Sequence, residues 1–168
     1  MKIVGAVLIV AACGGIGLSK AAAHRRLEQE LRNLIGVLEF MGCELQYRLT
    51  PLPELCRTAA DVTRGTIRHI MEGLAQELEQ QIAPDVSVCM AATLQKTQKT
   101  SPILTGHLER LGEWLGRFGL QGQLKSLDGL KAQCGDALKD LSFHRAERLR
   151  SYQTLGFCAG AALAILFI

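Results

Sequence analysis

The stretch "LEQELRNLIGVLEFMGCEL", residues 27–45, decides the fold because its apolar residues recur at alternating steps of four and three. The series comprises Leu27, Leu31, Leu34, Leu38, Met41 and Leu45. This spacing lines one face of an α-helix over about five turns and is typical of a helix that packs against other helices along its length. The helix must end before Pro51, because the residue that precedes a proline is disfavoured in the helical region.

Two shorter helices are predicted directly after Pro51. Residues 52–60 read as a short helix, with Thr50 as its N-cap. A second amphipathic run follows and is closed by Pro84. Its apolar face consists of Ile67, Ile70, Met71, Leu74, Leu78 and Ile82.

Two further helices are predicted between residues 86 and 119. Residues 86–98 have only a weak helical pattern. Ser101-Pro102 resembles an N-cap followed by proline at the first helical position, and Gly119 is expected to end that helix. One face of it is predicted to carry Leu104, Leu108, Leu111, Leu115 and Phe118. The stretch "LGEWLG" in the same helix has Gly112 and Gly116 four residues apart, which favours close packing of another helix over them.

The last apolar stripe leads directly into the C-terminal end of the chain. It comprises Leu124, Leu127, Cys134, Leu138 and Leu141, and Leu149 and Tyr152 extend it. No proline interrupts residues 103–168, so this helix and the apolar end are expected to form one rod, as are residues 2–48 at the other end. No stretch alternates with period two. The prediction is an all-α bundle of about six helices, in which the first and last helices are antiparallel neighbours.

Both ends of the chain are strongly apolar. Residues 3–18 and 155–168 contain no Asp, Glu, Lys or Arg, although 21% of the whole chain is charged. Each is short against the ~20 residues of a membrane span. We expect an N-terminal transmembrane helix at 1–19, a cytoplasmic helical bundle at 20–153 and a C-terminal transmembrane helix at 154–168. The alternatives for the first end are a lipoprotein signal with the lipid on Cys13, a cleaved secretory signal near Ala21–Ala23, and a buried core helix.

Basic residues on the inner side of both ends set the predicted direction of the spans. They are Lys20, Arg25, Arg26, Arg145, Arg148 and Arg150. Since positive residues stay on the cytoplasmic side, the middle of the chain is predicted to be cytoplasmic. Glycines predict that the spans pack against each other, against a second copy or against another protein. These are Gly14, Gly15, Gly17, Gly156 and Gly160.

The chain lacks the sequence signatures of catalysis. It has no G-x-x-x-x-G-K-[ST] phosphate loop, no G-x-S-x-G and no H-E-x-x-H. The six cysteines and four histidines are scattered, without zinc spacing. Acidic and basic residues are interleaved, and aromatic residues make up only 5%, which disfavours nucleic-acid binding. We therefore expect no enzyme activity, no cofactor, no metal site and no small-molecule substrate.

Three segments together are more specific than any of the patterns above. They are "ELQYRLTPLPEL" at 44–55, "LGEWLGRFGLQGQLKSL" at 111–127 and "YQTLGFCAGAALAILFI" at 152–168. This combination, in this order, resembles the stage III sporulation protein AB family of endospore-forming bacteria. The resemblance covers essentially the whole chain. The chain departs from the family after "LGEWLG", where an acidic residue is usual and "RFGL" stands here.

The resemblance implies a function that composition does not supply. Members of this family belong to a complex in the mother-cell membrane facing the forespore, and that complex is similar to secretion machinery. Their helical domain resembles the cytoplasmic domains of the platform protein of type II secretion and type IV pilus systems. The implied partners are a cognate secretion-type ATPase and other membrane subunits of the sporulation channel.

The T-P-L-P-E stretch has two compatible interpretations. Two prolines fix two φ angles near −65°, and a carboxylate near a helix start suits the helix dipole, so the stretch can be a rigid corner. It can also be a partner-binding loop. Its residues are Thr50, Pro51, Leu52, Pro53 and Glu54. The alternative function for the chain is an extracytoplasmic helical lipoprotein modified at Cys13.

Overall fold

In the part of the chain that it describes, the computed structural model contains six α-helices. It describes the backbone of residues 2–80, 85–97 and 100–167, and the side chains of residues 22–80, 85–97 and 100–143. The helices are α1 (Lys2–Tyr47), α2 (Leu52–Asp61), α3 (Thr66–Glu79), α4 (Val86–Lys96), α5 (Pro102–Trp114) and α6 (Leu120–Phe167). The predicted all-α architecture and number of helices are therefore confirmed.

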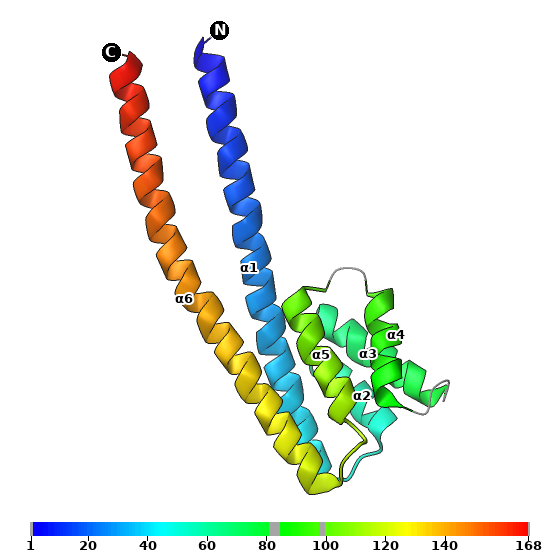
Figure 1. Ribbon diagram of the computed structural model, residues 1–168. Coiled ribbons are helices and arrows are strands. Elements are labelled where there is room, and N and C mark those ends of the chain that lie inside the picture. The colour runs from blue at the N-terminus through cyan, green and yellow to red at the C-terminus, as the bar shows by residue number, and fades with distance from the viewer. Residues whose placement is uncertain (1, 81–84, 98–99, 168) are drawn as a thin grey trace.

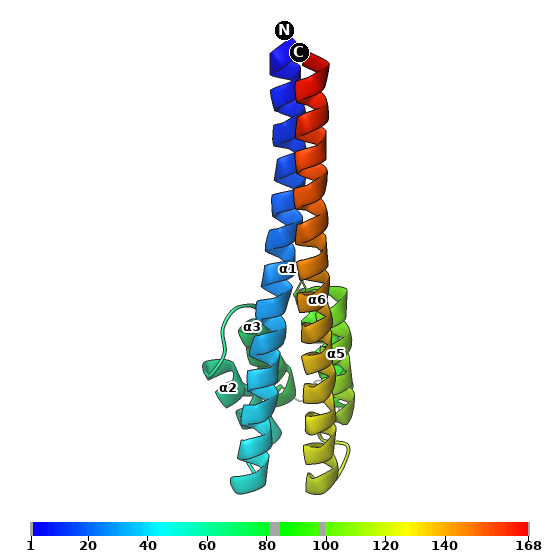
Figure 2. The same ribbon diagram turned by 90° about the vertical axis from the view of Figure 1, so that its left-hand side faces the viewer.

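Two long helices form the frame of the molecule (Figure 1). Helices α1 and α6 run antiparallel, and both chain termini lie at the same end. The four short helices pack together beside the other half of this hairpin (Figures 1 and 2). The prediction that each apolar end continues a long helix of the bundle is confirmed, since neither long helix is interrupted.

Helix α1 supplies the central face of the core. Its predicted apolar face is buried from Leu31 to Leu45, and Val37 joins it. Leu27, at the start of the face, is half-buried against the same core. Helix α6 covers this face from the other side with Leu127, Leu130 and Cys134. The alternating spacing of the sequence thus becomes a continuous contact between the two long helices.

The short helices pair as α2 with α3 and α4 with α5. Helix α3 buries the predicted residues from Ile67 to Leu74, and α5 buries Leu104, Leu108 and Leu111. Helix α4 lies close to α5 at Gly112, because a Cβ atom on Gly112 would stand 2.7 Å from the Cβ of Met90. The close helix packing predicted for Gly112 is confirmed, whereas Gly116, predicted in the same helix, lies beyond its last residue.

The structure corrects two predicted helix ends. Thr50 does not cap α2: Pro51 occupies the N-cap position, and the Thr50 hydroxyl donates to Glu44 Oε2 at 3.1 Å instead. Helix α5 ends at Trp114, so Gly119 is not its stop and Phe118 is not on its buried face. Gly116 makes the turn, with a φ of +78° that a glycine adopts without strain.

The predicted division at 1–19, 20–153 and 154–168 involves residues whose side chains lie outside the described part. Ile82, expected on the buried face of the second run, also lies outside it, and α3 ends at Glu79. Within residues 22–80, 85–97 and 100–143, no helical segment combines the length and the apolar character that crossing a bilayer requires.

Candidate functional site

Large apolar side chains are exposed at the end of the bundle opposite the chain termini. We call this surface the loop end and define it as Tyr47, Leu49, Pro51, Phe118 and Leu120. The exposed fractions of the four largest side chains are 78% for Tyr47, 68% for Leu49, 47% for Phe118 and 36% for Leu120. They come from the α1–α2 and α5–α6 connections, which Figure 1 shows together below the bundle.

The α1–α2 corner is built around one carboxylate. Glu44 accepts the Thr50 hydroxyl, and its other oxygen lies 3.7 Å from a guanidinium nitrogen of Arg48. The chain reverses at Leu49, which has a φ of +52°. That left-handed conformation costs a leucine roughly 1–2 kcal/mol. Pro51 then starts α2, because its carbonyl accepts the Leu55 N–H at 2.8 Å.

The α5–α6 connection lies against this corner. A Cβ atom on Gly116 would lie 3.7 Å from Leu52 Cδ2, so the two connections are in contact. Gln123 Nε2 donates to the Phe118 carbonyl at 2.9 Å, and this hydrogen bond joins the connection to the first turn of α6. The loop end therefore combines two connections that come from distant parts of the sequence and lie at the same end of the bundle.

The predicted T-P-L-P-E residues lie at this end of the bundle. Pro51 and Glu54 are exposed, while Thr50, Leu52 and Pro53 are half-buried. The sequence analysis did not predict that Leu49 and Phe118 are exposed. Gly116, two residues before Phe118, offers an earlier end to the helix than Gly119, but no local pattern favours one glycine over the other.

The other predicted site residues lie mostly outside the described side chains. This holds for the glycines of both ends, Gly14, Gly15, Gly17, Gly156 and Gly160, and for Lys20, Arg145, Arg148 and Arg150. Arg25 and Arg26 are described and exposed, and Arg26 lies 3.6 Å from Glu30. The packing of the predicted spans and the basic rim at the C-terminal end stay predictions.

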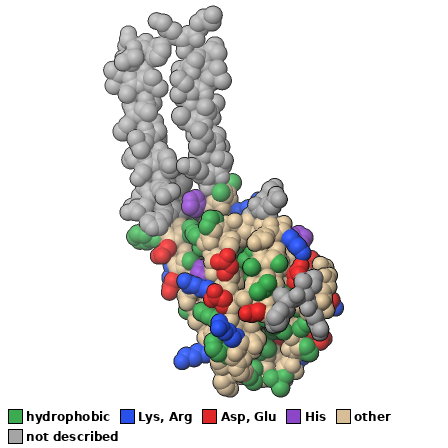
Figure 3. Space-filling model, turned by 45° about the vertical axis from the view of Figure 1, so that its right-hand side comes forward, with side chains coloured by type: hydrophobic (Ala, Val, Ile, Leu, Met, Phe, Trp, Pro, Cys, Tyr) green, Lys and Arg blue, Asp and Glu red, His purple; other side chains and the backbone are tan. Residues whose placement is uncertain are grey.

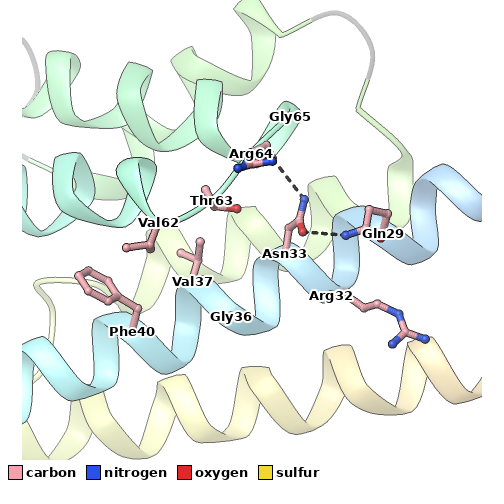
Figure 4. Close-up of a pocket in the computed structure, with 10 residues that line it drawn as sticks. All are labelled: Gln29, Arg32, Asn33, Gly36, Val37, Phe40, Val62, Thr63, Arg64 and Gly65. Atoms are coloured by element: carbon pink, nitrogen blue, oxygen red, sulfur yellow. Dashed lines mark hydrogen bonds between the residues drawn. The ribbon is translucent and has the colours of Figure 1, made fainter.

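A second feature is a groove of about 600 Å³ between α1 and the α2–α3 connection (Figure 4). We call it the Thr63 groove, after a threonine that is only 6% exposed and whose hydroxyl has no hydrogen-bond partner among the described residues. Asn33 Nδ2 donates to the Arg64 carbonyl at 3.3 Å and joins the connection to α1. Sequence reasoning missed this groove, because Thr63 reads as an ordinary loop residue.

Three groups in the bundle have pKa values that are shifted mainly by burial. Burial raises the pKa of the Cys56 thiol to about 12 and that of the Cys134 thiol to about 11, so both are unreactive. Burial, and secondarily the charge of Arg110, lowers the pKa of His107. Among the residues with described side chains, no three His, Cys, Asp or Glu residues are grouped so that they could hold a metal ion.

Charges on the bundle surface form mixed pairs. Arg57 pairs with Glu79, Lys96 with Glu77, and Lys131 lies 3.8 Å from Glu39. Acidic and basic side chains alternate on the face that Figure 3 shows. Glu28 and Arg32, four residues apart on α1, form a further pair, with 3.6 Å between a guanidinium nitrogen and a carboxylate oxygen.

The fold and these surfaces define a class of protein: an all-α protein in which four short helices pack beside a hairpin of two long ones. Residues 2–168 match the sequence profile of the family described as stage III sporulation protein AB. Stage III sporulation protein AB of Bacillus subtilis (strain 168) is 25% identical over 175 residues, which cover 100% of this chain and 99% of the relative. The chain belongs to the stage III sporulation protein AB family, as its sequence motifs predicted, and its role is in sporulation.

A solved structure has the same fold. A structure of stage III sporulation protein AB superposes with a TM-score of 0.65 at 17% sequence identity. The match covers 73% of this chain and 98% of that chain.

Proposed function

We propose that this chain is a non-enzymatic scaffold subunit of a secretion-like channel complex between mother cell and forespore, and that its loop end docks a cognate ATPase. The observation that carries the proposal is the exposure of four large apolar side chains on the loop end. Exposed apolar clusters rimmed by polar residues are typical of protein interaction sites. Tyr and Phe are also enriched in protein interfaces, and Tyr is enriched among the residues that dominate binding energy.

The conformation of Leu49 supports a binding role for this surface. An exposed leucine gains nothing from burial, yet here it occupies a left-handed backbone conformation that Asn or Gly would adopt more easily. A strained residue at the tip of a rigid corner is typical of a functional constraint. Docking of an apolar side chain into a partner accounts for both the exposure and the residue type.

The long hairpin supports attachment to a membrane at the opposite end. Helices α1 and α6 end there with apolar sequence, and charged residues are confined to the inner side of both ends except for Lys2. In this proposal both ends insert in the mother-cell membrane that faces the forespore, and the bundle projects into the mother-cell cytoplasm. The loop end is then the part of the protein furthest from the bilayer, where a soluble ATPase has free access.

Binding between the purified full chain in lipid nanodiscs and a secretion-type ATPase from the same organism tests the docking. Leu49→Asn and Phe118→Ser should each weaken binding by roughly tenfold, because they remove apolar contact at the centre of the surface. Val88→Ser is the matched control, since Val88 is 54% exposed on α4, away from the loop end. Equal affinities for all three variants and the wild type would contradict docking at the loop end.

Topology is tested separately in cells. A reporter that is active only in the cytoplasm, inserted between Glu79 and Val86, should be active and should remain with the membrane fraction. A stable fusion that is inactive would contradict a cytoplasmic bundle, whatever the result of the ATPase experiment.

A further inference from the structure

We propose that the Thr63 groove binds a segment of another protein chain in which a carboxylate stands beside an apolar side chain. This site is distinct from the loop end, and the proposal does not depend on the docking of an ATPase. Four observations on the groove carry it: an apolar floor, cationic edges, an unpartnered buried hydroxyl and a glycine that keeps the space open.

The floor of the groove is apolar, and one of its three residues, Val62, is accessible. It is formed by Val37 and Phe40 of α1 and by Val62 of the α2–α3 connection, whose side chains lie together in Figure 4. Val62 is 56% exposed, although its neighbours Thr63 and Ala60 are buried. An apolar side chain of a partner would cover Val62 and gain the usual free energy of removing apolar surface from water.

The charged residues that line the groove are all basic. They are Arg32 on α1 and Arg64 on the connection, and no Asp or Glu lines it. Arg32 forms an ion pair with Glu28, whereas Arg64 forms no ion pair with any residue in the described part of the chain. The backbone of Arg64 is fixed by the Asn33 hydrogen bond, so its guanidinium starts from a defined position beside the groove. A carboxylate is the complementary group, and arginine binds it with two parallel hydrogen bonds.

The Thr63 hydroxyl supplies a directional contact. Thr63 is only 6% exposed, and its hydroxyl has no hydrogen-bond partner in the described part of the chain. Its oxygen points toward Asn33 in the groove (Figure 4). Buried hydroxyls without a partner are rare in folded proteins, because the lost hydrogen bond to water is not replaced. A carbonyl or carboxylate oxygen of a bound segment would accept this hydrogen bond.

Gly36 explains why the groove is not filled by α1 itself. A Cβ atom at this position would meet no atom within 4 Å, so the fold tolerates a side chain there. Glycine in a helix interior is nevertheless less stable than alanine by about 1 kcal/mol. The space beside Gly36 is empty, and the glycine lowers the stability of the helix. Both features are consistent with a second chain that approaches the backbone of α1 closely.

The exposure of the walls favours a chain segment over a small molecule. Small ligands are usually enclosed, with most of their surface buried. Here Arg64 and Gly65 form an exposed wall on one side, and Gln29 and Arg32 are exposed on the other. An extended or helical segment can lie along such a groove, with one apolar side chain on its floor and a carboxylate at its edge.

Photo-cross-linking of the full chain in sporulating cells tests the proposal. Benzoylphenylalanine replaces Val62, or Val88 as a control of nearly equal exposure outside the groove. The expected result is a cross-link from position 62 to another protein, stronger than that from position 88 by roughly fivefold or more, a margin typical of a specific contact. Mass spectrometry should place the linked residue within a few residues of an Asp or Glu next to an apolar residue.

Two variants in the same cross-linkable chain make the test specific. Arg64→Glu reverses the charge at the edge, and Gly36→Gln puts a side chain into the space without a clash with the fold. Both should reduce the cross-link from position 62 severalfold and leave the amount of the protein unchanged. A yield at position 62 no higher than at 88, a linked segment without a carboxylate, a link to lipid or to a second copy of this chain, or full cross-linking in both variants would each overturn the proposal.

Discussion

The contact between α4 and α5 at Gly112 gives the sharpest prediction on stability. In the structure, the position of a Cβ atom on Gly112 lies 2.7 Å from Met90 Cβ, 3.1 Å from Met90 Cγ and 3.4 Å from Ser87 Cα. The nearest of these is the root of the Met90 side chain, which cannot rotate away. Gly112→Ala therefore requires α4 to move away from α5 by roughly an ångström to reach ordinary carbon–carbon contact.

The magnitude follows from two opposing terms. Alanine in place of glycine favours a helix by about 1 kcal/mol. Overpacking a core costs typically about 1–3 kcal/mol. For Gly112→Ala the second term exceeds the first, and we expect a net loss of about 1 kcal/mol. Gly106→Ala in the same helix is the matched control, because nothing lies within 4 Å of its Cβ position. That variant should gain up to about 1 kcal/mol.

Thermal unfolding of the full chain in detergent, followed by far-ultraviolet circular dichroism, measures the difference. The helix-propensity gain is common to both variants, so the difference between them isolates the overlap with Met90. A difference of about 2 kcal/mol corresponds to a Tm roughly 4–8 °C lower for Gly112→Ala than for Gly106→Ala. If Gly112→Ala melts at the same temperature as Gly106→Ala or higher, α4 does not pack over α5 at this distance.

Three further predictions concern single residues. Leu49→Asn should raise the free energy of unfolding by about 1 kcal/mol in chemical denaturation, because asparagine tolerates the φ of +52° better than leucine. A substitution at Tyr47 should give no such gain. The pKa of His107 is lowered in the fold, so the folded state binds fewer protons than the unfolded state below about pH 6.5. The free energy of unfolding should therefore fall as the pH drops below that value. His107→Gln should flatten this part of the plot of stability against pH, and an unchanged plot would contradict a lowered pKa for His107. Iodoacetamide at pH 8 should modify the exposed Cys43 in the native chain and leave Cys56, with its pKa of about 12, unmodified until unfolding; rapid modification of Cys56 would show that it is not buried.

The sequence predicted most of the helices because burial follows helical periodicity. In α1, α3 and α5 the apolar residues recur at steps of three and four, and the same residues form the core. Helix α4 was weakly indicated for a physical reason. It is short, and its buried residues, Cys89, Met90 and Thr93, are interrupted by small side chains that do not mark a face.

The predictions that were wrong or missing concern features that depend on contacts between segments distant in the sequence. Thr50 is a reasonable N-cap by type, but its hydroxyl is taken by Glu44, which the preceding helix brings beside it. The turn after α5 occurs at Gly116 because Val86 and Leu52 pack around it there, and no local pattern distinguishes it from Gly119. The Thr63 groove arises where a loop docks on α1, so a single sequence gives no signal for it.

Hydrogen exchange of the full chain in nanodiscs, with and without the cognate ATPase, tests most directly whether the loop end is the docking surface. The proposal predicts that the ATPase slows exchange in residues 47–51 and 116–120 and leaves the start of α4, at Val86–Met90, unchanged. Protection of α4, or of any other part of the bundle, with unaltered exchange in both loop-end segments would contradict it.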